Sequence, residues 1–378
     1  MSKRGGLGRG VEFLAGDSFN CREKVLEYSE VRLSQIEATQ YVPKYSLERN
    51  EYQRLLERVK LEGLSEPLLL RIAGRGKFRL VAGEMKLQAA REAGLKKVPA
   101  KLLPANDQEG GQGARIMVIA NQKGGVGKTT TTINLAAGLA ILDFRVLVVD
   151  ADPPDATKGL GFETAVSGIG LTEEVHSHEQ LVNATVATEL SNLDLISFHS
   201  RSANGGGKNF SLPMVEKVLK MNLDKLRNNY DFILIDSSPS LGLITVSALI
   251  AADSVMVPVQ GEYYALEGLG KLLNTIRIIK TRLNPGLCIE GFLVTMFDSR
   301  LNLSNQTYQS LKQTFGYLVF DTVIRRNVRL GEAPRDGKPL LMLDASSAGA
   351  INHLYLAREL AQRNGLLDSR DERIRKNK

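Results

Sequence analysis

The sequence is poor in the residues that build covalent or metal-bound frameworks. It contains no tryptophan, 4 histidines and 2 cysteines (Cys21 and Cys288) among its 378 residues. Two cysteines are too few for a disulfide framework or a cysteine metal site, which indicates a reducing, cytoplasmic setting. No apolar run approaches the ~18 residues of a membrane-spanning helix, and residues 1–20 lack the apolar block of a secretory signal. We therefore expect neither a secreted nor a membrane-spanning protein.

The composition is that of a folded protein with a modest excess of positive charge. Hydrophobic residues make up 43% of the chain and charged residues 24%, which is enough apolar surface for a real core. The 49 basic residues exceed the 42 acidic ones by 7. At about 150 residues per domain, the length predicts roughly two folded units.

Glycine content and hydrophobic patterning divide the chain further. The first residues are rich in glycine and basic residues and cannot bury enough apolar surface to fold alone. A second glycine-rich stretch, ANDQEGGQG, separates two regions of different pattern. The predicted segments are a flexible basic segment 1–16, a small α/β domain 17–104, a linker 105–114, a larger α/β domain 115–365 and a charged tail 366–378.

The larger domain shows short, mostly continuous apolar runs that alternate with helical stretches. Continuous runs, rather than alternating ones, are typical of strands covered on both faces, which predicts a doubly wound, mostly parallel sheet. The predicted strands are 116–120, 146–150, 193–196, 232–236, 254–259 and 291–295. In the small domain the pattern predicts helices over 46–59 and 83–95 and neighbouring strands over 67–72 and 77–81.

A glycine-rich loop follows the first strand of the larger domain. The segment KGGVGKTT, Lys123 to Thr130, lies between a strand and a helix, although Gln122 stands where the usual GxxxxGK pattern begins with glycine. Backbone N–H groups of such a loop bind a β-phosphate, its lysine reaches the β- and γ-phosphates, and the following threonine binds Mg²⁺. The residues expected to bind the nucleotide are Gly124, Gly125, Val126, Gly127, Lys128, Thr129 and Thr130.

The second lysine of this loop, Lys123, is the feature that points to a family. With it, the loop resembles the deviant Walker A box of the ParA/MinD ATPases. The resemblance implies a homodimer that forms on ATP, in which Lys123 reaches the nucleotide of the partner subunit and neutralises developing charge. The fold it implies is the P-loop NTPase type of doubly wound sheet.

Two aspartates complete the nucleotide site that this resemblance implies. Asp152 lies in DADPPDATKGLG, which looks like the switch I loop of the family and would orient the attacking water. Asp236 ends the run FILID at the Walker B position and would hold Mg²⁺ through a water. An aspartate that ends an apolar strand is otherwise often a helix cap, but the phosphate loop favours the metal role. The implied activity is Mg²⁺-dependent ATP hydrolysis.

Three further stretches resemble the partition ATPases rather than the cell-division branch. They are 258–276, 291–304 and 326–340, and they extend the similarity over about 115–363. The resemblance implies that Pro258 borders the nucleotide. It also implies that Arg300, Arg329 and Arg326 bind double-stranded DNA without sequence preference, with Arg325, Lys312 and Arg335 nearby in sequence. We expect a cytoplasmic, nucleoid-associated protein of chromosome or plasmid partition, with a separate ParB-type partner and no membrane contact.

Three departures from the family pattern leave a second function open. The switch I loop is one residue shorter and is stiffened by Pro154, Ser238 replaces a proline after Walker B, and Arg325 replaces a proline near the expected adenine site. The alternative function is therefore a slow or non-hydrolysing ATP switch that positions a protein cargo or regulates a partition system.

The first hundred residues resemble the N-terminal part of ParB. KRGGLGRGVEFLAG is similar to the short box by which ParB stimulates its ATPase, and the domain after it follows the order of the CTP-binding domain of ParB. Its GERRxRA box stands here as GEMKLQA, and no helix-turn-helix follows, so we expect neither CTP hydrolysis nor recognition of a specific DNA site. Residues 1–16 are either a basic flexible leader or an activating segment, whose cations would be Lys3, Arg4 and Arg9.

Overall fold

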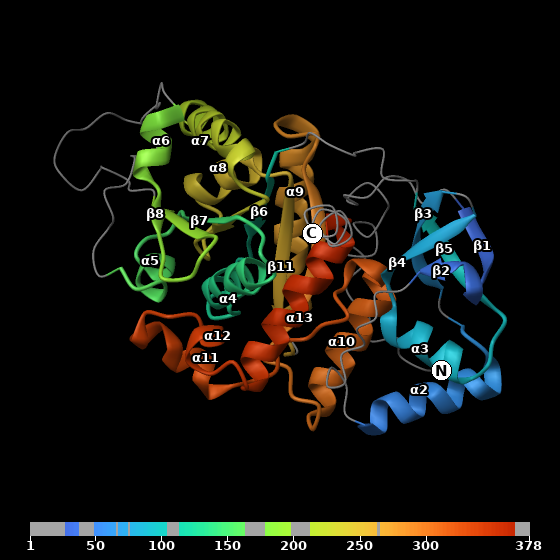
Figure 1. The fold of residues 1–378 in the computed structure, drawn as a ribbon. Helices are drawn as coiled ribbons and strands as arrows, with labels where there is room; N and C mark the ends of the chain where they lie inside the picture. Colours follow the sequence, from blue (N-terminus) through green and yellow to red (C-terminus); the bar gives the residue numbers. More distant parts are fainter. Residues whose placement is uncertain are drawn as a thin grey trace, which may run out of the picture. The chain divides into compact units, whose positions relative to one another are not determined.

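The computed structural model contains two compact units, each built around its own sheet (Figure 1). The larger unit includes residues 112–357 and the smaller one includes 22–111. The structure describes residues 27–37, 49–65, 67–74, 76–103, 113–162, 178–197, 212–262 and 265–366.

The larger unit is a seven-stranded sheet in the order β12-β11-β6-β10-β7-β9-β8. Every neighbouring pair is parallel except β8 and β9, which are antiparallel. The strands are β6 (Arg115–Ile119), β7 (Val146–Asp150), β8 (Val186–Ala187), β9 (Leu193–Ser197), β10 (Phe232–Asp236), β11 (Ser254–Gln260) and β12 (Cys288–Thr295).

Helices cover both faces of this sheet, as the continuous apolar runs predict. Alternate strand residues such as Ile233 and Ile235 share one apolar cluster with α7, α8 and α9. Helix α4 packs on β6, β7 and β10, and its Gly138 lies against His353 and Ala357 of α13. The helices are α4 (Lys128–Ile141), α5 (Asp155–Gly159), α6 (His178–Ala184), α7 (Leu212–Leu226), α8 (Leu243–Ala251), α9 (Ala265–Arg282), α10 (Asn302–Phe315), α11 (Val328–Glu332), α12 (Leu340–Leu343) and α13 (Ala348–Arg363).

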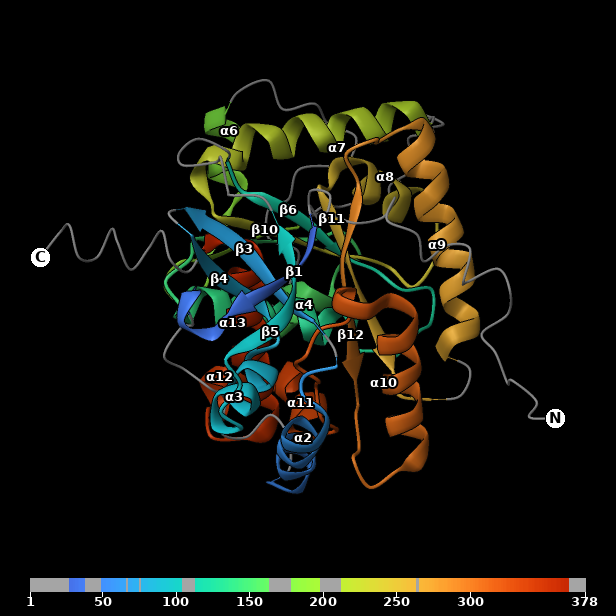
Figure 2. The ribbon, with the colours of Figure 1, turned by 90° about the vertical axis from the view of Figure 1, so that its right-hand side faces the viewer.

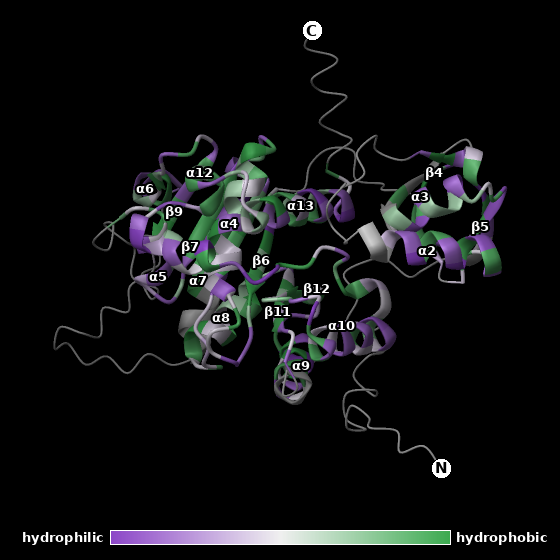
Figure 3. Cartoon of the chain, turned by 90° about the horizontal axis from the view of Figure 1, so that it is seen from below, coloured by the Kyte–Doolittle hydropathy of each residue, from purple (hydrophilic) through white to green (hydrophobic). Residues whose placement is uncertain are grey.

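The central strands supply the core of the larger unit. All residues of β7 and β10 are buried, and Figure 3 shows β6 in the green of the hydrophobic end of the scale. The six predicted strands and the doubly wound fold are confirmed, while β8, two residues long, was not predicted. Among the described residues, no helix is long and apolar enough to cross a membrane.

The smaller unit is a mixed sheet in the order β1-β5-β3-β4-β2, with two helices together beneath its strands in Figure 2. Its predicted helices and its two predicted strands are confirmed, although the expected helix start at Ser46 lies outside the described residues. Strands β1, β2 and β5 were not predicted. The elements are β1 (Glu27–Arg32), β2 (Ile36–Glu37), α2 (Arg49–Glu62), β3 (Leu68–Gly74), β4 (Lys77–Ala82), α3 (Glu84–Glu92) and β5 (Lys97–Leu103).

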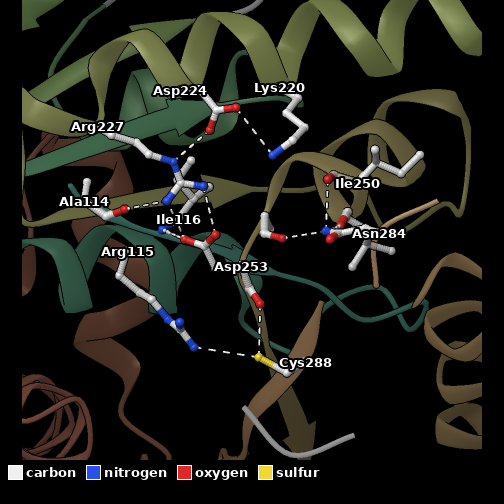
Figure 4. Close-up of polar contacts among 12 residues, drawn as sticks. Ala114, Arg115, Ile116, Lys220, Asp224, Arg227, Ile250, Asp253, Asn284 and Cys288 are labelled. Atoms are coloured by element: carbon white, nitrogen blue, oxygen red, sulfur yellow. Dashed lines mark hydrogen bonds and ion pairs between the residues drawn. The ribbon is translucent and has the colours of Figure 1, made fainter. Parts of the chain in front are cut away.

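An arginine fixes the start of β6, the strand that leads to the glycine-rich loop (Figure 4). The Arg227 guanidinium donates to both carboxylate oxygens of Asp253, at 2.8 and 2.9 Å, to Asp224 at 2.7 Å and to the Ala114 carbonyl at 3.0 Å. The Asp253 carboxylate also accepts the backbone N–H of Ile116 at 2.8 Å. The two carboxylates raise the pKa of Arg227, so the guanidinium keeps its charge.

We predict that Arg227→Ala lowers the free energy of unfolding by about 2 kcal/mol, because it leaves the half-buried Asp253 carboxylate and the Ala114 carbonyl without this donor. Chemical denaturation of the full chain measures the effect. Arg145→Ala is the matched control, since its pair with Asp231 is more exposed and should contribute less than about 1 kcal/mol. Equal losses in the two variants would contradict the anchoring role of Arg227.

Candidate functional site

The predicted nucleotide residues converge where the parallel strands β6, β7 and β10 end. Because these strands are adjacent and parallel, their carboxyl ends meet at one edge of the sheet, where ligands of doubly wound folds bind. The glycine-rich loop connects β6 to α4 at this edge, and Asp150 and Asp236 are cross-strand partners at the ends of β7 and β10.

The loop has the backbone shape that binds an anion. Gly125 and Gly127 adopt left-handed conformations (φ 72° and 87°), which glycine reaches without strain. Cβ atoms placed on Gly124, Gly125 or Gly127 would meet no atom within 4 Å, so the loop faces open space. Helix α4 begins at Lys128 without a side-chain cap, which leaves its first N–H groups for an anion.

The back of the loop is held by neighbouring strands. The Val126 carbonyl accepts a hydrogen bond from the Thr295 hydroxyl of β12 at 2.9 Å, and Val126 itself is buried. Pro258 lies in β11, and its carbonyl accepts the Asn121 side chain at 2.6 Å, while Asn121 accepts the backbone N–H of Lys123 at 3.0 Å. These bonds join the loop to β11 and β12, which follow one another on the same side of β6, so contacts within the protein hold the loop in this shape.

The first turn of α4 places a cation and a hydroxyl beside the Walker B carboxylate. Lys128 is 7% exposed. Burial lowers the pKa of its ammonium, and the carboxylates of Asp236 and Asp152 partly oppose that shift. The Thr129 hydroxyl donates to Asp236 Oδ2 at 2.7 Å, and Thr132 donates to Oδ1 at 3.1 Å. Thr130 lies in the same turn, and its carbonyl accepts the Asn134 side chain.

Asp236 is a buried carboxylate with hydroxyl partners. Burial raises the pKa of Asp236 to about 7, the neighbouring Asp150 carboxylate adds to the rise, and the two threonine hydroxyls oppose it. A divalent cation beside Asp236 and Thr129 would stabilise the ionised carboxylate, and oxygen ligands of this kind suit Mg²⁺. The residues present therefore fit a magnesium ion bound together with a phosphate.

Asp150 holds the predicted switch I loop. Its Oδ2 accepts the backbone N–H of Thr157 at 2.8 Å and the Thr157 hydroxyl at 2.6 Å, and its Oδ1 accepts the backbone N–H of Asp152 at 3.2 Å. Burial raises the pKa of Asp150, and these hydrogen bonds oppose the shift. The hydrogen bond from its backbone N–H to Asp150 thus positions Asp152. The charge of the Asp152 carboxylate favours the protonated form of Lys128 and so opposes the fall in the pKa of that lysine.

The second lysine of the loop bonds to an acidic residue that follows a neighbouring strand. Lys123 Nζ lies 2.8 Å from Glu262 Oε2, just beyond β11, and the Gln260 side chain donates to the other Glu262 oxygen at 2.7 Å. Both partners are partly exposed, at 37% and 51%, so the ion pair is weak and easily exchanged. The sequence motif identified Lys123 but gave no sign of Glu262.

The predicted DNA-binding arginines lie on neighbouring segments of the larger unit. Arg300 is exposed but bonds to both oxygens of Asp298, at 2.9 and 2.6 Å, and holds the pKa of that carboxyl near 2. The Arg326 backbone N–H bonds to Phe297, which brings Arg326 close to Asp298. The side chain of Arg329, in the first turn of α11, lies 3.4 Å from the Glu332 carboxylate and 4.0 Å from the Asp344 carboxylate, and both contacts are long.

Several site expectations concern other parts of the chain. Lys3, Arg4 and Arg9 lie outside the described residues, so their activating role stays a prediction. Lys312 turns back into its own unit and donates to the Val319 carbonyl at 3.0 Å. Asp150 was expected only as the end of a strand, and Thr157 and Thr132 were not expected at the site.

Comparisons with known proteins agree with this geometry. A model described as an AAA domain matches residues 114–289, and a ParB N-terminal domain model matches residues 18–121. The chain is 47% identical over 250 residues to the sporulation initiation inhibitor protein Soj of Bacillus subtilis, which spans 65% of this chain and 98% of Soj. It is 44% identical over 255 residues to the chromosome partitioning protein ParA of Caulobacter vibrioides, across 66% of this chain and 94% of that protein.

The chain belongs to the ParA/Soj family of partition ATPases. Its N-terminal part is a ParB N-terminal domain, which adds a second partition-type module to the ParA-type ATPase. The resemblance inferred from the phosphate loop, Walker B and switch I residues is thereby confirmed for the family and for the fold.

Two solved structures similar to this ParA/Soj-family chain contain a nucleotide. Cobyrinic acid a,c-diamide synthase from Mycobacterium smegmatis, with bound ADP and magnesium, is 32% identical with a TM-score of 0.52, over 65% of this chain and 93% of that one. The McdA(D38A)–ATP complex from Cyanothece is 25% identical with a TM-score of 0.55, over 65% and 97% of the two chains.

We predict that Asp236→Asn stabilises the ligand-free protein at neutral and alkaline pH. The carboxyl ionises near pH 4 in the unfolded chain but near pH 7 in the fold, so stability is greatest at acid pH and is lost as the pH rises to 7. The variant avoids this loss, which amounts to roughly 4 kcal/mol at most above pH 7.

Urea denaturation between pH 5 and 8 without Mg²⁺ or nucleotide measures the difference. The gap between variant and wild type should widen up to pH 7 and then level off. Asp143→Asn, at an exposed aspartate, is the control and should show a constant difference. If the free energies of unfolding of Asp236→Asn and wild type differed by the same amount at every pH, the result would contradict the raised pKa of Asp236.

Proposed function

We propose that this chain is a Mg²⁺-dependent ATPase of DNA partition that dimerises on ATP and binds double-stranded DNA without sequence preference in that state. The observation that carries the proposal is that the two lysines of one loop lie in different environments. Lys128 is buried at the start of α4 beside Asp236, whereas Lys123 is held at the surface by Glu262. A surface lysine in a weak ion pair is available to a second subunit, which is the role that the family resemblance implies.

ATP hydrolysis would use residues that the fold already brings together. The loop N–H groups and Lys128 would bind the phosphates, and Thr129 and Asp236 would hold Mg²⁺, which neutralises phosphate charge when bound. Asp152, fixed through Asp150, would orient the attacking water. The partner subunit would supply a second Lys123, whose charge would stabilise the transition state.

DNA binding would rest on the arginines near the end of β12 and on α11. Arg300 would have to give up a short ion pair with Asp298 before its guanidinium could bind a phosphate. The guanidinium of Arg329 would give up only long contacts, to Glu332 and Asp344. We therefore rank Arg329 above Arg300 as a phosphate ligand. Because no base needs to be contacted, binding would be weak, sequence-independent and steeply dependent on salt.

The shortened switch I loop favours a slow enzyme as the second candidate. Pro153 and Pro154 follow Asp152 directly, which restricts the backbone next to the residue that would orient water. Two results together would identify the slow or non-hydrolysing switch. The chain would dimerise on ATP, and its rate of ATP hydrolysis would stay low when DNA is added.

We predict that Lys123→Ala abolishes ATP-dependent dimerisation and lowers the hydrolysis rate about 100-fold, as the loss of one charge-stabilising donor does elsewhere. Nucleotide binding should survive, because the loop and Lys128 remain. Light scattering with ATP, together with a phosphate-release assay, measures both effects. Lys271→Ala, at an exposed lysine of α9, should behave as wild type. A Lys123→Ala chain that still dimerises on ATP would overturn the proposed role.

For DNA, we predict that Arg329→Ala weakens binding to a non-specific duplex and lowers the slope of log affinity against log salt by about 1, the effect of losing one phosphate contact. Fluorescence anisotropy across a salt series with ATP gives the slope. Arg300→Ala should change it less, and Arg277→Ala, at an exposed arginine of α9, should leave it unchanged. An unaltered slope for Arg329→Ala would remove Arg329 from the DNA surface.

A further inference from the structure

Two glycines bring the switch I region into direct backbone contact with the segment that carries the DNA-binding arginines. A Cβ atom placed on Gly337 would lie 2.9 Å from the Cα of Gly161, and one placed on Gly161 would lie 3.0 Å from the Gly337 carbonyl. Both residues adopt left-handed conformations, with φ 62° and 92°. The contact therefore depends on glycine at both positions, through conformation and through space.

On one side, this contact belongs to the nucleotide site. Gly161 closes the turn after α5, and its N–H bonds to the Lys158 carbonyl at 3.0 Å. Helix α5 is tied to Asp150 through Thr157, and Asp150 in turn bonds to the backbone of Asp152. Gly161 thus follows Thr157 by four residues (161 − 157) and Asp152, the residue that would orient the attacking water, by nine (161 − 152).

On the other side, the contact belongs to residues 326–337, which we call the arginine segment. It comprises α11, with Arg329, and the 3-10 helix η6 (Ala333–Asp336), with the exposed Arg335. Gly337 ends η6, and its N–H bonds to the Pro334 carbonyl. The chain just beyond is also fixed to the first turns of α4, since the Leu340 N–H donates to the Asn134 side chain at 2.8 Å.

We propose that the Gly161–Gly337 contact transmits the nucleotide state of switch I to the arginine segment, so that DNA affinity follows the nucleotide bound. The proposal rests on the DNA binding proposed above and adds the route of its control. Backbones in van der Waals contact cannot absorb a displacement as a flexible side chain can, so a shift of the switch I turn moves Gly337 with it. Because the Leu340 N–H is bonded to Asn134, the chain beyond Gly337 stays fixed to α4, and the arginine segment would rotate about that point rather than translate.

Two glycine variants separate transmission from backbone strain. Gly337→Ala places a methyl group against the backbone of Gly161, at φ 62° and ψ 27°. Gly316→Ala is the strain control, because Gly316 also has a positive φ (57°, with ψ −123°), where alanine is strained, but no atom lies within 4 Å of an added Cβ. The measurement is the ratio of affinities for a non-specific DNA duplex with ATP and with ADP, by anisotropy on the full chain.

We expect Gly337→Ala to lower this ratio by about fivefold or more, with ATP binding preserved, and Gly316→Ala to keep the wild-type ratio. A folded Gly337→Ala chain with the wild-type ratio would overturn the coupling alone. A wild-type chain that binds DNA equally with ATP and ADP would overturn nucleotide-gated DNA binding, and the coupling with it.

Hydrogen exchange on the wild-type chain decides the matter if Gly337→Ala does not fold. Without DNA, replacing ADP by ATP in the presence of Mg²⁺ should slow amide exchange both in 150–162 and in 326–340, and leave 302–316 unchanged. Protection confined to 150–162 would overturn the proposal, because the arginine segment would then be independent of the nucleotide.

Discussion

The nucleotide site depends on two carboxylates buried side by side at the ends of adjacent parallel strands. Asp150 and Asp236 are register partners, both are out of solvent, and burial raises the pKa of each. Such a pair is costly unless cations and hydroxyl donors surround it. Lys128, Thr129 and Thr132 satisfy part of that need, and Asp150 uses its remaining lone pairs to fix the switch I turn. The two carboxylates therefore need more positive charge than the described side chains supply, and a bound cation would provide it.

Much of this could be predicted from sequence because the signals are local. A buried parallel strand shows as a continuous apolar run, so all six long strands of the larger sheet were found, and the loop between β6 and α4 has a motif. Strand β8 has two residues and no such signal. In the smaller unit, β1 (EYSEVR) is largely polar and β5 (KVPAKLL) contains a proline, so neither has the pattern of a strand.

Several contacts of the site join residues that only the tertiary structure brings together, and for that reason they could not be predicted from the sequence. Glu262 meets Lys123 only because β11 and β6 are neighbours, and Thr157 reaches Asp150 only because α5 folds back on β7. Gly161 and Gly337 are 176 residues apart (337 − 161) and meet backbone to backbone. These three contacts involve the parts of the chain to which the proposals assign roles: Lys123 of the phosphate loop, the switch I loop and the arginine segment.

Complementation between two inactive chains tests the central claim, that catalysis needs Lys123 from one subunit and Asp152 from the other. Lys123→Ala and Asp152→Asn chains are each assayed alone for ATP hydrolysis and then mixed in equal amounts. The account predicts little activity alone and recovery in the mixture to at most about a quarter of the wild-type rate, because only a mixed dimer keeps a Lys123 opposite an intact Asp152, at one of its two sites. A mixture no more active than its separate components would contradict action across the subunit interface.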